Sequence, residues 1–344
     1  MTTVLASASV TSDTSLVRFY RIGGCLLAFN FDDETTARLA GNFLECFYFR
    51  ALPADATVGP TCTVEVFSGC LPRLPSVRQT FEVPRGSCHT SGDYFHFDID
   101  ESRVTVHPAG EPLVSVWLGE TEHARHPVAI VNALSYAIQA ALRKSSLFDF
   151  HAAGVVEPRT GAGLLIAGGS NSGKSSLTIR LAASGWGYLS DDMLVLEGEG
   201  LQVRARALRR IFAVSEGALA GLGMPDLFAA LGTPVNSDRS KRRLEPDVGF
   251  PGRFVADCVP RTLCFAKITG ENLSRVEPLS QAEAMRRLIR HCPWASYDHG
   301  TGREHLGVLA RLAGQCSAFM LYSGRDLLEE PTRAAELLAP CLRN

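Results

Sequence analysis

A glycine-rich run that ends in a lysine and a serine carries the clearest chemical signal in the sequence. Residues 168–175 read GGSNSGKS, which fits the pattern G-x-x-x-x-G-K-[ST] of a phosphate-binding loop. Glycines let backbone N–H groups close around phosphate oxygens, and the following helix N-terminus adds partial positive charge. In such a loop Lys174 would neutralise the β- and γ-phosphates of ATP, and Ser175 would offer its hydroxyl to Mg²⁺. The alternative is an ordinary glycine-rich turn. The residues expected to bind the nucleotide are Gly168, Gly169, Ser170, Asn171, Ser172, Gly173, Lys174, Ser175 and Ser176.

Two adjacent aspartates follow this run at a distance that suits phosphoryl transfer. Asp191 and Asp192 come 17 and 18 residues after Lys174 and just before the apolar run MLVL. A helix and a short return would place these carboxylates near the phosphates. One carboxylate could hold Mg²⁺, directly or through water, and the other could take a proton from an attacking hydroxyl. The alternative is a solvated Asp-Asp turn that opens a strand.

A histidine begins the run HAAGVV that precedes the glycine-rich segment. His151, at the start of an expected strand, could contact the phosphates or orient an aspartate. A lone histidine is as readily a structural or an exposed residue, and nothing in its neighbourhood decides between these roles.

The segments around these residues have the pattern of alternating strands and helices. The apolar run GLLIA before the glycine-rich run is typical of a buried strand, and SSLTIRLAAS after it is typical of a helix. The sequence therefore predicts α/β organisation from residue 146 onward, with a mobile, polar and basic loop at 232–243. Strands are expected at 152–156, 164–167, 193–196, 203–208, 263–268 and 318–322, and helices at 173–184, after the capping residue Ser280, at 305–313 and from Pro331.

The first part of the chain is richer in strands. Alternating apolar and polar residues predict strands at 17–22, 25–29, 63–67, 94–99, 104–107 and 113–118. One helix is expected at 33–48, and an amphipathic helix within 127–142 leads into the second part. We therefore expect a strand-rich domain over residues 1–145 and a catalytic domain over 146–344. The first domain carries no motif, so it could recognise a substrate or partner, form a subunit interface, or cap the second domain.

Composition argues against several classes of protein. The 344 residues are 46% hydrophobic and 20% charged, which suits a folded chain with a substantial core. A net charge of −2 gives no general attraction for nucleic acid. The most apolar stretch, 127–142, is too short and too interrupted to span a membrane. The first residues do not resemble a secretory signal, and the ten cysteines form no Cys-x-x-Cys pair. We expect a cytoplasmic protein with reduced cysteines.

Three of these features occur together in one known family. The run HAAGV from His151, the run GAGLLIAGGSNSGKSS from Gly161 and the run GWGYLSDD from Gly185 resemble the core of bacterial HPr serine kinase/phosphorylase. That family has a His-Gly strand, a strand-borne phosphate loop and an Asp-Asp pair at this distance from the loop lysine. The match is close from His151 to Asp192 and looser over the rest of the second half.

The resemblance implies both a fold and a set of roles. The fold would be that of the HPr kinase catalytic domain, which is similar to phosphoenolpyruvate carboxykinase and differs from the Ras and ABC types of P-loop domain. Lys174 and Ser175 would bind ATP phosphates and Mg²⁺, and Asp192 would be the general base. His151 would lie beside the phosphates and the aspartates, and Asp191 would support the metal or the base.

The chain departs from the family after the aspartate pair. The run of the Glu-Val-Arg-Gly-Gly or Leu-Gly type, which serves phosphate chemistry in the bifunctional enzymes, is replaced by ALRRIFAVSEGALAGL and later by DRSKRRLEPD. This difference argues against phosphorylase activity, a hexameric assembly and HPr as substrate. The chain looks more like the divergent HPr-kinase-related proteins, some of which phosphorylate peptide or small-molecule hydroxyls. In the basic run at 241–243, Arg243 could stabilise the transferring phosphoryl group, or the run could be a solvated loop.

The sequence therefore predicts an ATP-dependent kinase that transfers the γ-phosphoryl group to a serine-type hydroxyl of a peptide, protein or small molecule. Two alternatives stay open: a nucleotide-binding regulatory module without transfer, and a kinase or phosphorylase of a small metabolite. A carboxykinase would need further metal and acid ligands that the sequence does not assign. These patterns do not determine the acceptor, the choice between ATP and another phosphate donor, or the reversibility of the reaction. They also leave the oligomeric state open, and a homo-oligomer is one option.

Overall fold

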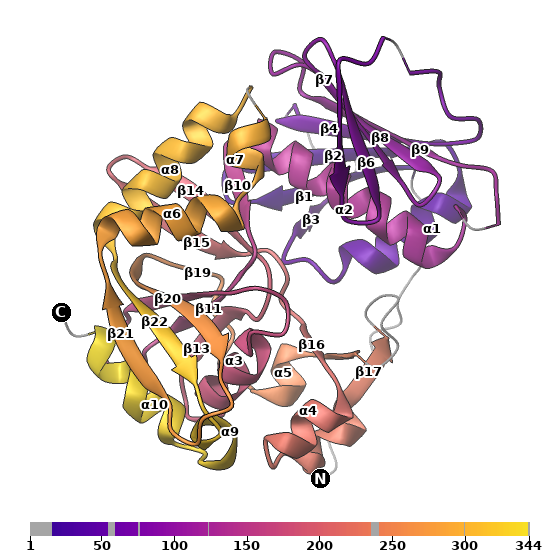
Figure 1. The fold of residues 1–344 in the computed structure, drawn as a ribbon. Helices are drawn as coiled ribbons and strands as arrows, with labels where there is room; N and C mark the ends of the chain where they lie inside the picture. Colours follow the sequence, from indigo (N-terminus) through magenta and orange to yellow (C-terminus); the bar gives the residue numbers. More distant parts are fainter. Residues whose placement is uncertain are drawn as a thin grey trace.

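A computed structural model describes residues 16–53, 59–74, 76–122, 124–234, 241–298 and 300–342. Within these residues the chain is a mixed α/β protein with several sheets. A nine-stranded sheet and two helices form one half of the molecule, and three smaller sheets with their helices form the other half (Figure 1). No helix in the described ranges is both long and apolar enough to cross a membrane.

The nine-stranded sheet has the strand order β3-β1-β2-β4-β9-β8-β7-β6-β5. Helix α2 (Pro127–Lys144) packs across it with an almost wholly buried face that includes Leu134 and Ile138. Helix α1 (Glu34–Leu44) begins at Asp33, whose carboxylate accepts the Thr36 N–H at 2.8 Å. The strands are β1 (Val17–Ile22), β2 (Cys25–Phe31), β3 (Arg50–Leu52), β4 (Cys62–Ser68), β5 (Gln79–Val83), β6 (Gly86–Ser91), β7 (Tyr94–Ile99), β8 (Ser102–Val106) and β9 (Leu113–Leu118).

All six strands expected in this half are present, and the helix expected at 33–48 is shorter than predicted. It ends at Leu44 because the next residues pair with a distant segment. Phe47 forms a β-bridge with Arg209, and the Tyr48 N–H donates to the Leu208 carbonyl at 2.8 Å. Strands β3, β5 and β6 were not expected, since their mostly exposed or half-buried residues carry a weak apolar pattern.

The other half contains a six-stranded sheet of order β13-β11-β12-β20-β22-β21, in which β12, β20 and β22 are parallel. A four-stranded sheet, β10-β14-β15-β19, and a three-stranded sheet, β16-β18-β17, accompany it. The strands are β10 (Leu147–Phe150), β11 (Ala152–Val156), β12 (Gly163–Ala167), β13 (Gly187–Ser190), β14 (Leu194–Glu199), β15 (Gln202–Ala207), β16 (Phe212–Val214), β17 (Leu231–Pro234), β18 (Arg242–Leu244), β19 (Asp257–Cys258), β20 (Pro260–Ile268), β21 (Arg275–Leu279) and β22 (Ser317–Ser323).

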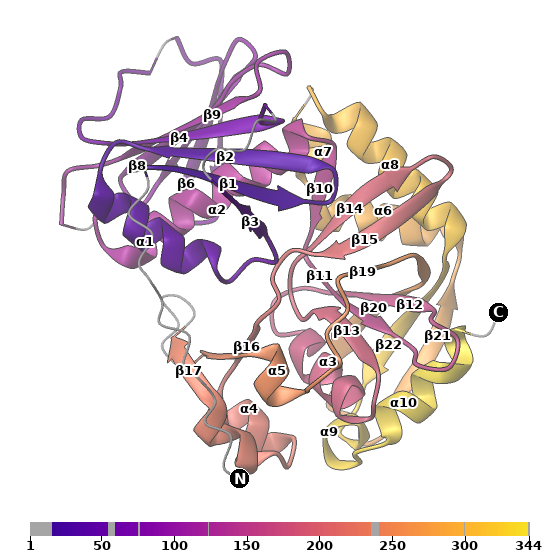
Figure 2. The same ribbon diagram turned by 180° about the vertical axis from the view of Figure 1, so that it is seen from behind.

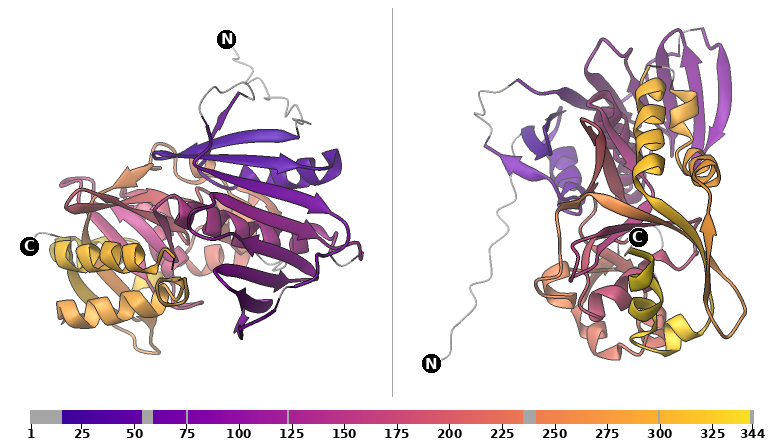
Figure 3. Two further views of the ribbon diagram at one scale, coloured as in Figure 1. Left: turned by 90° about the horizontal axis from the view of Figure 1, so that it is seen from above. Right: turned by 90° about the vertical axis from the view of Figure 1, so that its left-hand side faces the viewer.

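Helices cover these sheets. Helix α3 (Lys174–Ala183) packs on β11 and β13, and α6 (Gln281–His291) and α8 (Gly302–Gln315) pack on each other and on β22. Figure 3 shows the orange helices of residues 281–315 beside the purple strands of the nine-stranded sheet. The remaining short helices are α4 (Glu216–Gly221), η1 (Pro225–Ala230), α5 (Pro246–Gly249), α7 (Trp294–Tyr297), α9 (Asp326–Glu329), α10 (Arg333–Leu338) and η2 (Ala339–Leu342).

The elements expected after residue 146 are present with shifts of a few residues at their ends, and the Ser280 hydroxyl accepts the Glu283 N–H as a helix cap at 3.2 Å. The mobile loop expected at 232–243 needs correction. Residues 231–234 and 242–244 are strands of the small sheet, because Leu231 and Leu244 pair and are buried there. Residues 235–240 of that prediction lie outside the described ranges. The division at residue 145 stays a prediction; it falls between α2 and β10.

Candidate functional site

The glycine-rich segment connects the end of β12 to the start of α3. Gly173 caps the helix with φ +89°, a left-handed conformation that favours glycine, and Asn171 has φ +59°. A Cβ atom on Gly168 would collide with the Ser172 side chain and would approach the Ala266 carbonyl oxygen to 2.8 Å. The glycines therefore allow a tight turn into α3, whose first N–H groups have no partner within the helix.

Lys174, the first residue of α3, lies across this turn. Its side chain is buried, and Nζ donates to the carbonyl oxygens of Gly168 at 2.9 Å and Gly169 at 3.1 Å. Burial lowers the pKa of this amine, while the nearby carboxylates of Asp192 and Asp191 oppose that change. A buried ammonium group held at a helix N-terminus is well placed to meet an anion.

Asp192 lies at the turn between β13 and β14 and has two partners. Its Oδ1 is 3.2 Å from His151 Nε2, and its Oδ2 accepts from Arg209 Nη1 at 3.2 Å. The Ser190 hydroxyl accepts the Asp192 N–H at 3.3 Å and the Met193 N–H at 3.1 Å, which fixes the turn. The carboxylate is partly exposed, so it is oriented and still accessible from solvent.

Asp191 has the opposite environment. It is 1% exposed, its Oδ1 has no hydrogen-bond partner in the described part of the chain, and its Oδ2 accepts weakly from the Ala213 N–H at 3.5 Å. Burial, reinforced by the negative charge of Asp192, raises the pKa of Asp191 to about 6. Arg209, the Ser175 hydroxyl and the Ala213 amide oppose this rise. The pair is therefore not a solvated turn.

His151 lies just before β11, and half of its side chain is exposed. Desolvation in the cleft lowers the pKa of its imidazole, with Lys174 and Arg209 acting in the same direction and Asp192 against it. The ring is therefore biased toward its neutral form at neutral pH, in which Nε2–H can donate to Asp192.

A cleft of about 430 Å³ brings most of the expected residues together. Such a volume lies within the range of small-molecule sites. Gly168 and Asp191 are buried and Gly169 is exposed, and none of these three residues lines the cleft. The edge of the small sheet supplies the other lining residues. The lining residues are His151, Ser170, Asn171, Ser172, Gly173, Lys174, Ser175, Ser176, Asp192, Ala213, Val214, Ser215, Ala218 and Lys241.

Arg243 is the one expected site residue that the structure places elsewhere. Its Nη2 donates to the Asn42 carbonyl oxygen of α1 at 3.4 Å, and it does not line the cleft. Lys241 lies just before β18, whereas Arg243 lies within that strand and contacts α1. Lys241 reaches the cleft instead.

Sequence reasoning missed Arg209, although its guanidinium contacts Asp192. The only local signal was the Arg-Arg pair in ALRRIF. Its relation to Asp192 depends on the long-range pairing of residues 46–48 with residues 208–210, which no local pattern reveals.

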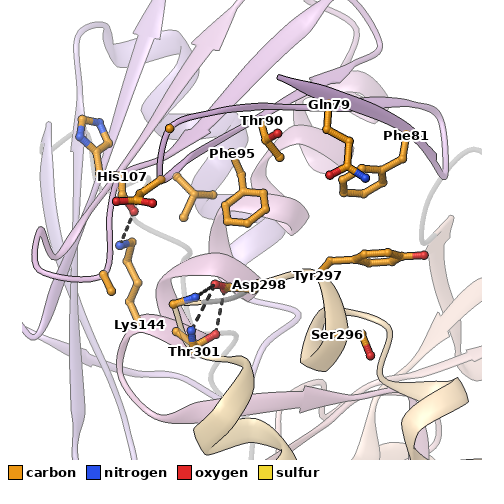
Figure 4. Close-up of a pocket in the computed structure, with 15 residues that line it drawn as sticks. Gln79, Phe81, Thr90, Phe95, His107, Lys144, Ser296, Tyr297, Asp298 and Thr301 are labelled. Carbon is orange, nitrogen blue, oxygen red and sulfur yellow. Dashed lines mark hydrogen bonds between the residues drawn. The ribbon is translucent and has the colours of Figure 1, made fainter. Parts of the chain in front are cut away.

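A larger cavity, of about 550 Å³, lies far from these residues, between strands β5–β8 and residues 296–301 (Figure 4). Its amine, Lys144 Nζ, already donates to the carbonyl oxygens of His107, Pro108 and Glu111 at 2.6–2.9 Å. Its half-buried acid, Asp298, accepts from the N–H groups of Gly300 and Thr301 at 3.1 and 3.2 Å. These charges are engaged within the protein, so size alone does not favour this cavity as the functional site.

No protein-family model and no curated protein matches the chain. No group of three or more His, Cys, Asp or Glu side chains suited to a metal occurs within the described ranges. A Mg²⁺ site in a nucleotide-binding protein typically uses one or two carboxylates together with substrate phosphates. The interpretation of the cleft therefore depends on its geometry.

Replacing Asp191 with asparagine should stabilise the Mg²⁺-free protein at pH 8. The folded-state pKa of Asp191, about 6, lies above the ordinary 3.8, so the ionised carboxylate opposes folding at high pH. The cost is absent below pH 4 and fully present above about pH 7, and it is on the order of 3 kcal/mol for a rise from 3.8 to about 6. Urea unfolding at pH 8 and pH 4 checks this: the advantage of Asp191→Asn should shrink toward acid pH, and a less stable variant at pH 8 would contradict it.

Proposed function

We propose that the protein is an ATP-dependent kinase that transfers the γ-phosphoryl group to a serine-type hydroxyl. The observation that carries this proposal is that one cleft holds both the Lys174 loop and the Asp192 carboxylate. A loop with a helix N-terminus and a lysine binds phosphates, and a nearby carboxylate can accept a proton from an attacking hydroxyl. The resemblance of residues 151–192 to HPr kinase is in line with this chemistry, and under this proposal the protein would be one of its divergent relatives.

The glycine-rich loop would hold the phosphates of ATP. The N–H groups of residues 170–175 and the ammonium of Lys174 would supply donors and positive charge, and Lys241 is a second cation in the cleft lining. Lys174 would exchange its two carbonyl partners for phosphate oxygens, which carry more negative charge.

Two residues fit a Mg²⁺ ion beside these phosphates. The unpartnered, buried Oδ1 of Asp191 and the neighbouring Ser175 hydroxyl are hard oxygen donors of the kind that Mg²⁺ prefers. When bound, the ion would neutralise charge on the phosphates. Its positive charge would also remove the electrostatic cost of the ionised Asp191 carboxylate.

Asp192 would act as the base. As the acceptor oxygen bonds to the γ-phosphorus and the bond to the β,γ-bridging oxygen breaks, the hydroxyl proton passes to Asp192 and ADP leaves. His151 and Arg209 hold the two carboxylate oxygens in place, which keeps the base oriented toward the cleft. A cytoplasmic location and the peptide, protein or small-molecule nature of the acceptor remain part of the proposal.

Calorimetric titration with ATP and AMP, each with and without Mg²⁺, tests the nucleotide site. ATP should bind at least tenfold more tightly than AMP, and Mg²⁺ should strengthen only ATP binding, because the loop recognises the β- and γ-phosphates. Equal affinities for ATP and AMP, or no binding of either, would contradict the proposal.

Arg209→Gln should lower kcat about 10- to 100-fold while changing the KM for ATP little, because Arg209 positions Asp192 and does not line the cleft. Arg209→Lys should recover part of this loss, since an amine can still reach the carboxylate. Steady-state kinetics of both variants, with Arg303→Gln as an exposed control on α8, make the comparison. Identical losses in the glutamine and lysine variants, or a change confined to KM, would rule out a positioning role.

A further inference from the structure

A second cavity, of about 530 Å³, lies beside the candidate site and is rich in arginine. We call it the arginine pocket; its charged lining residues are Arg18, Arg38, Arg210, Arg243, Glu45 and Glu245. It lies between α1, strands β1 and β3, and the segments around β16 and β18, which occupy the same side of the molecule in Figure 2.

Positive charge exceeds negative charge in this pocket, in contrast to the net charge of −2 for the whole chain. Arg210 forms an ion pair of 3.4 Å with Glu245. Arg243 contacts only the Asn42 carbonyl oxygen, and its Nε is buried without a hydrogen-bond partner in the described residues. Arg38, exposed on α1, has no ion pair within the same ranges. Guanidinium groups that lack a carboxylate are therefore directed into one cavity.

Aromatic rings form another part of the pocket. Phe47 stacks on Phe49 with ring centroids 5.2 Å apart, and Tyr20 lies 5.9 Å from Phe49. A pocket of arginines and aromatic rings suits a ligand that combines an anionic group with apolar atoms. An acidic side chain in a peptide is such a ligand. The two glutamates in the lining would repel a polyanion such as nucleic acid.

The pocket and the cleft share a wall. Arg209 points to Asp192 in the candidate site, whereas its neighbour Arg210 lines the arginine pocket. On the adjacent segment Lys241 lines the cleft and Arg243 lines the pocket. A ligand in the pocket thus lies against the segments that position the base.

We propose that the arginine pocket binds an acidic segment of a peptide acceptor and so holds its hydroxyl-bearing residue near the cleft. This inference rests on the proposed kinase function and names its substrate class as peptides with Asp or Glu close to the acceptor residue. Carboxylates pair with guanidinium groups through parallel hydrogen bonds, which gives both charge and directional recognition.

A binding selection that needs no catalysis tests this inference. The full-length protein is immobilised and exposed to a degenerate library of serine-containing peptides, and the bound pool is sequenced. Asp and Glu should be enriched at least about threefold near the serine for the wild type and for Lys174→Ala. The double variant R38Q/R210Q should lose this enrichment while binding ATP normally, and Arg303→Gln should retain it. Both substituted arginines have exposed side chains, so the fold should persist.

The outcomes separate the two proposals. Enrichment of acidic peptides that disappears in R38Q/R210Q supports the arginine pocket, even if no peptide gains phosphate and the kinase proposal fails. Enrichment of neutral or basic peptides, or acidic enrichment that survives in the double variant, overturns it. The peptide proposal is also overturned if inorganic phosphate binds in competition with ATP and no acidic peptides are selected. In that case the positive charge of the pocket would bind a free anion.

Discussion

Replacing Lys174 with alanine should lower phosphoryl transfer by about 1,000-fold or more and weaken ATP binding. The ammonium group lies at the N-terminus of α3 in the cleft, and among the described residues it is the only lysine that donates to the Gly168 and Gly169 carbonyls. Loss of this positive charge would weaken the binding of the ATP phosphates and would also remove stabilisation of the negative charge on the phosphoryl group in the transition state. ATP titration and initial rates measure the two effects.

The fold should survive this change. Burial lowers the pKa of Lys174, which means that keeping the buried amine charged costs free energy, and alanine avoids that cost. The thermal transition of Lys174→Ala should therefore stay close to that of the wild type. Lys267→Ala, an exposed change on β20, is the matched control and should leave activity unaltered. Wild-type turnover in Lys174→Ala would remove the phosphate-loop interpretation.

Replacing Asp192 with asparagine should abolish most transfer while preserving ATP binding. Asparagine has nearly the same shape and can still contact His151 and Arg209, but it cannot accept a proton. General-base contributions of this kind are about 100- to 10,000-fold. The expected signature is a fall in kcat with little change in the dissociation constant of ATP.

Two comparisons make this prediction specific. Asp226→Asn, at an exposed position of η1, should behave as the wild type. Asp192→Glu should recover part of the rate, because it restores a carboxylate one methylene out of position. An unaltered transfer rate in Asp192→Asn would eliminate this residue as the base, and equal loss in Asp226→Asn would point to a general effect on the protein.

The sequence predicted the local part of the candidate site well. The strand before residue 168, the helix from Lys174 and the turn at Asp191 and Asp192 depend on apolar runs, on glycine and on capping, all of which act over a few residues. The side chains that the loop brings into the cleft follow from these short elements. His151 could be placed at a strand end, but its contact with Asp192 needed the pairing of β11 with β13.

The features that sequence reasoning missed depend on contacts between distant segments. Arg209 reaches Asp192 because residues 46–48 and 208–210 pair across nearly half the chain, a contact with no local signature. Arg243 was expected near the phosphates because it belongs to a basic run, but the pairing of β18 with β16 fixes this residue where its side chain contacts α1. Strand pairing decides which face a side chain occupies, and one residue of shift reverses it.

The most direct test of the kinase proposal is transfer of a labelled γ-phosphate. The purified protein is incubated with Mg²⁺ and γ-labelled ATP, first with serine- and threonine-containing peptides and then with small hydroxyl compounds, and the products are analysed by mass spectrometry. We predict that an acceptor hydroxyl gains one labelled phosphate, and that Lys174→Ala and Asp192→Asn both fail to produce it. ATP that binds without phosphorylating any acceptor would indicate a regulatory nucleotide-binding module, and a chain that does not bind ATP would contradict the proposal entirely.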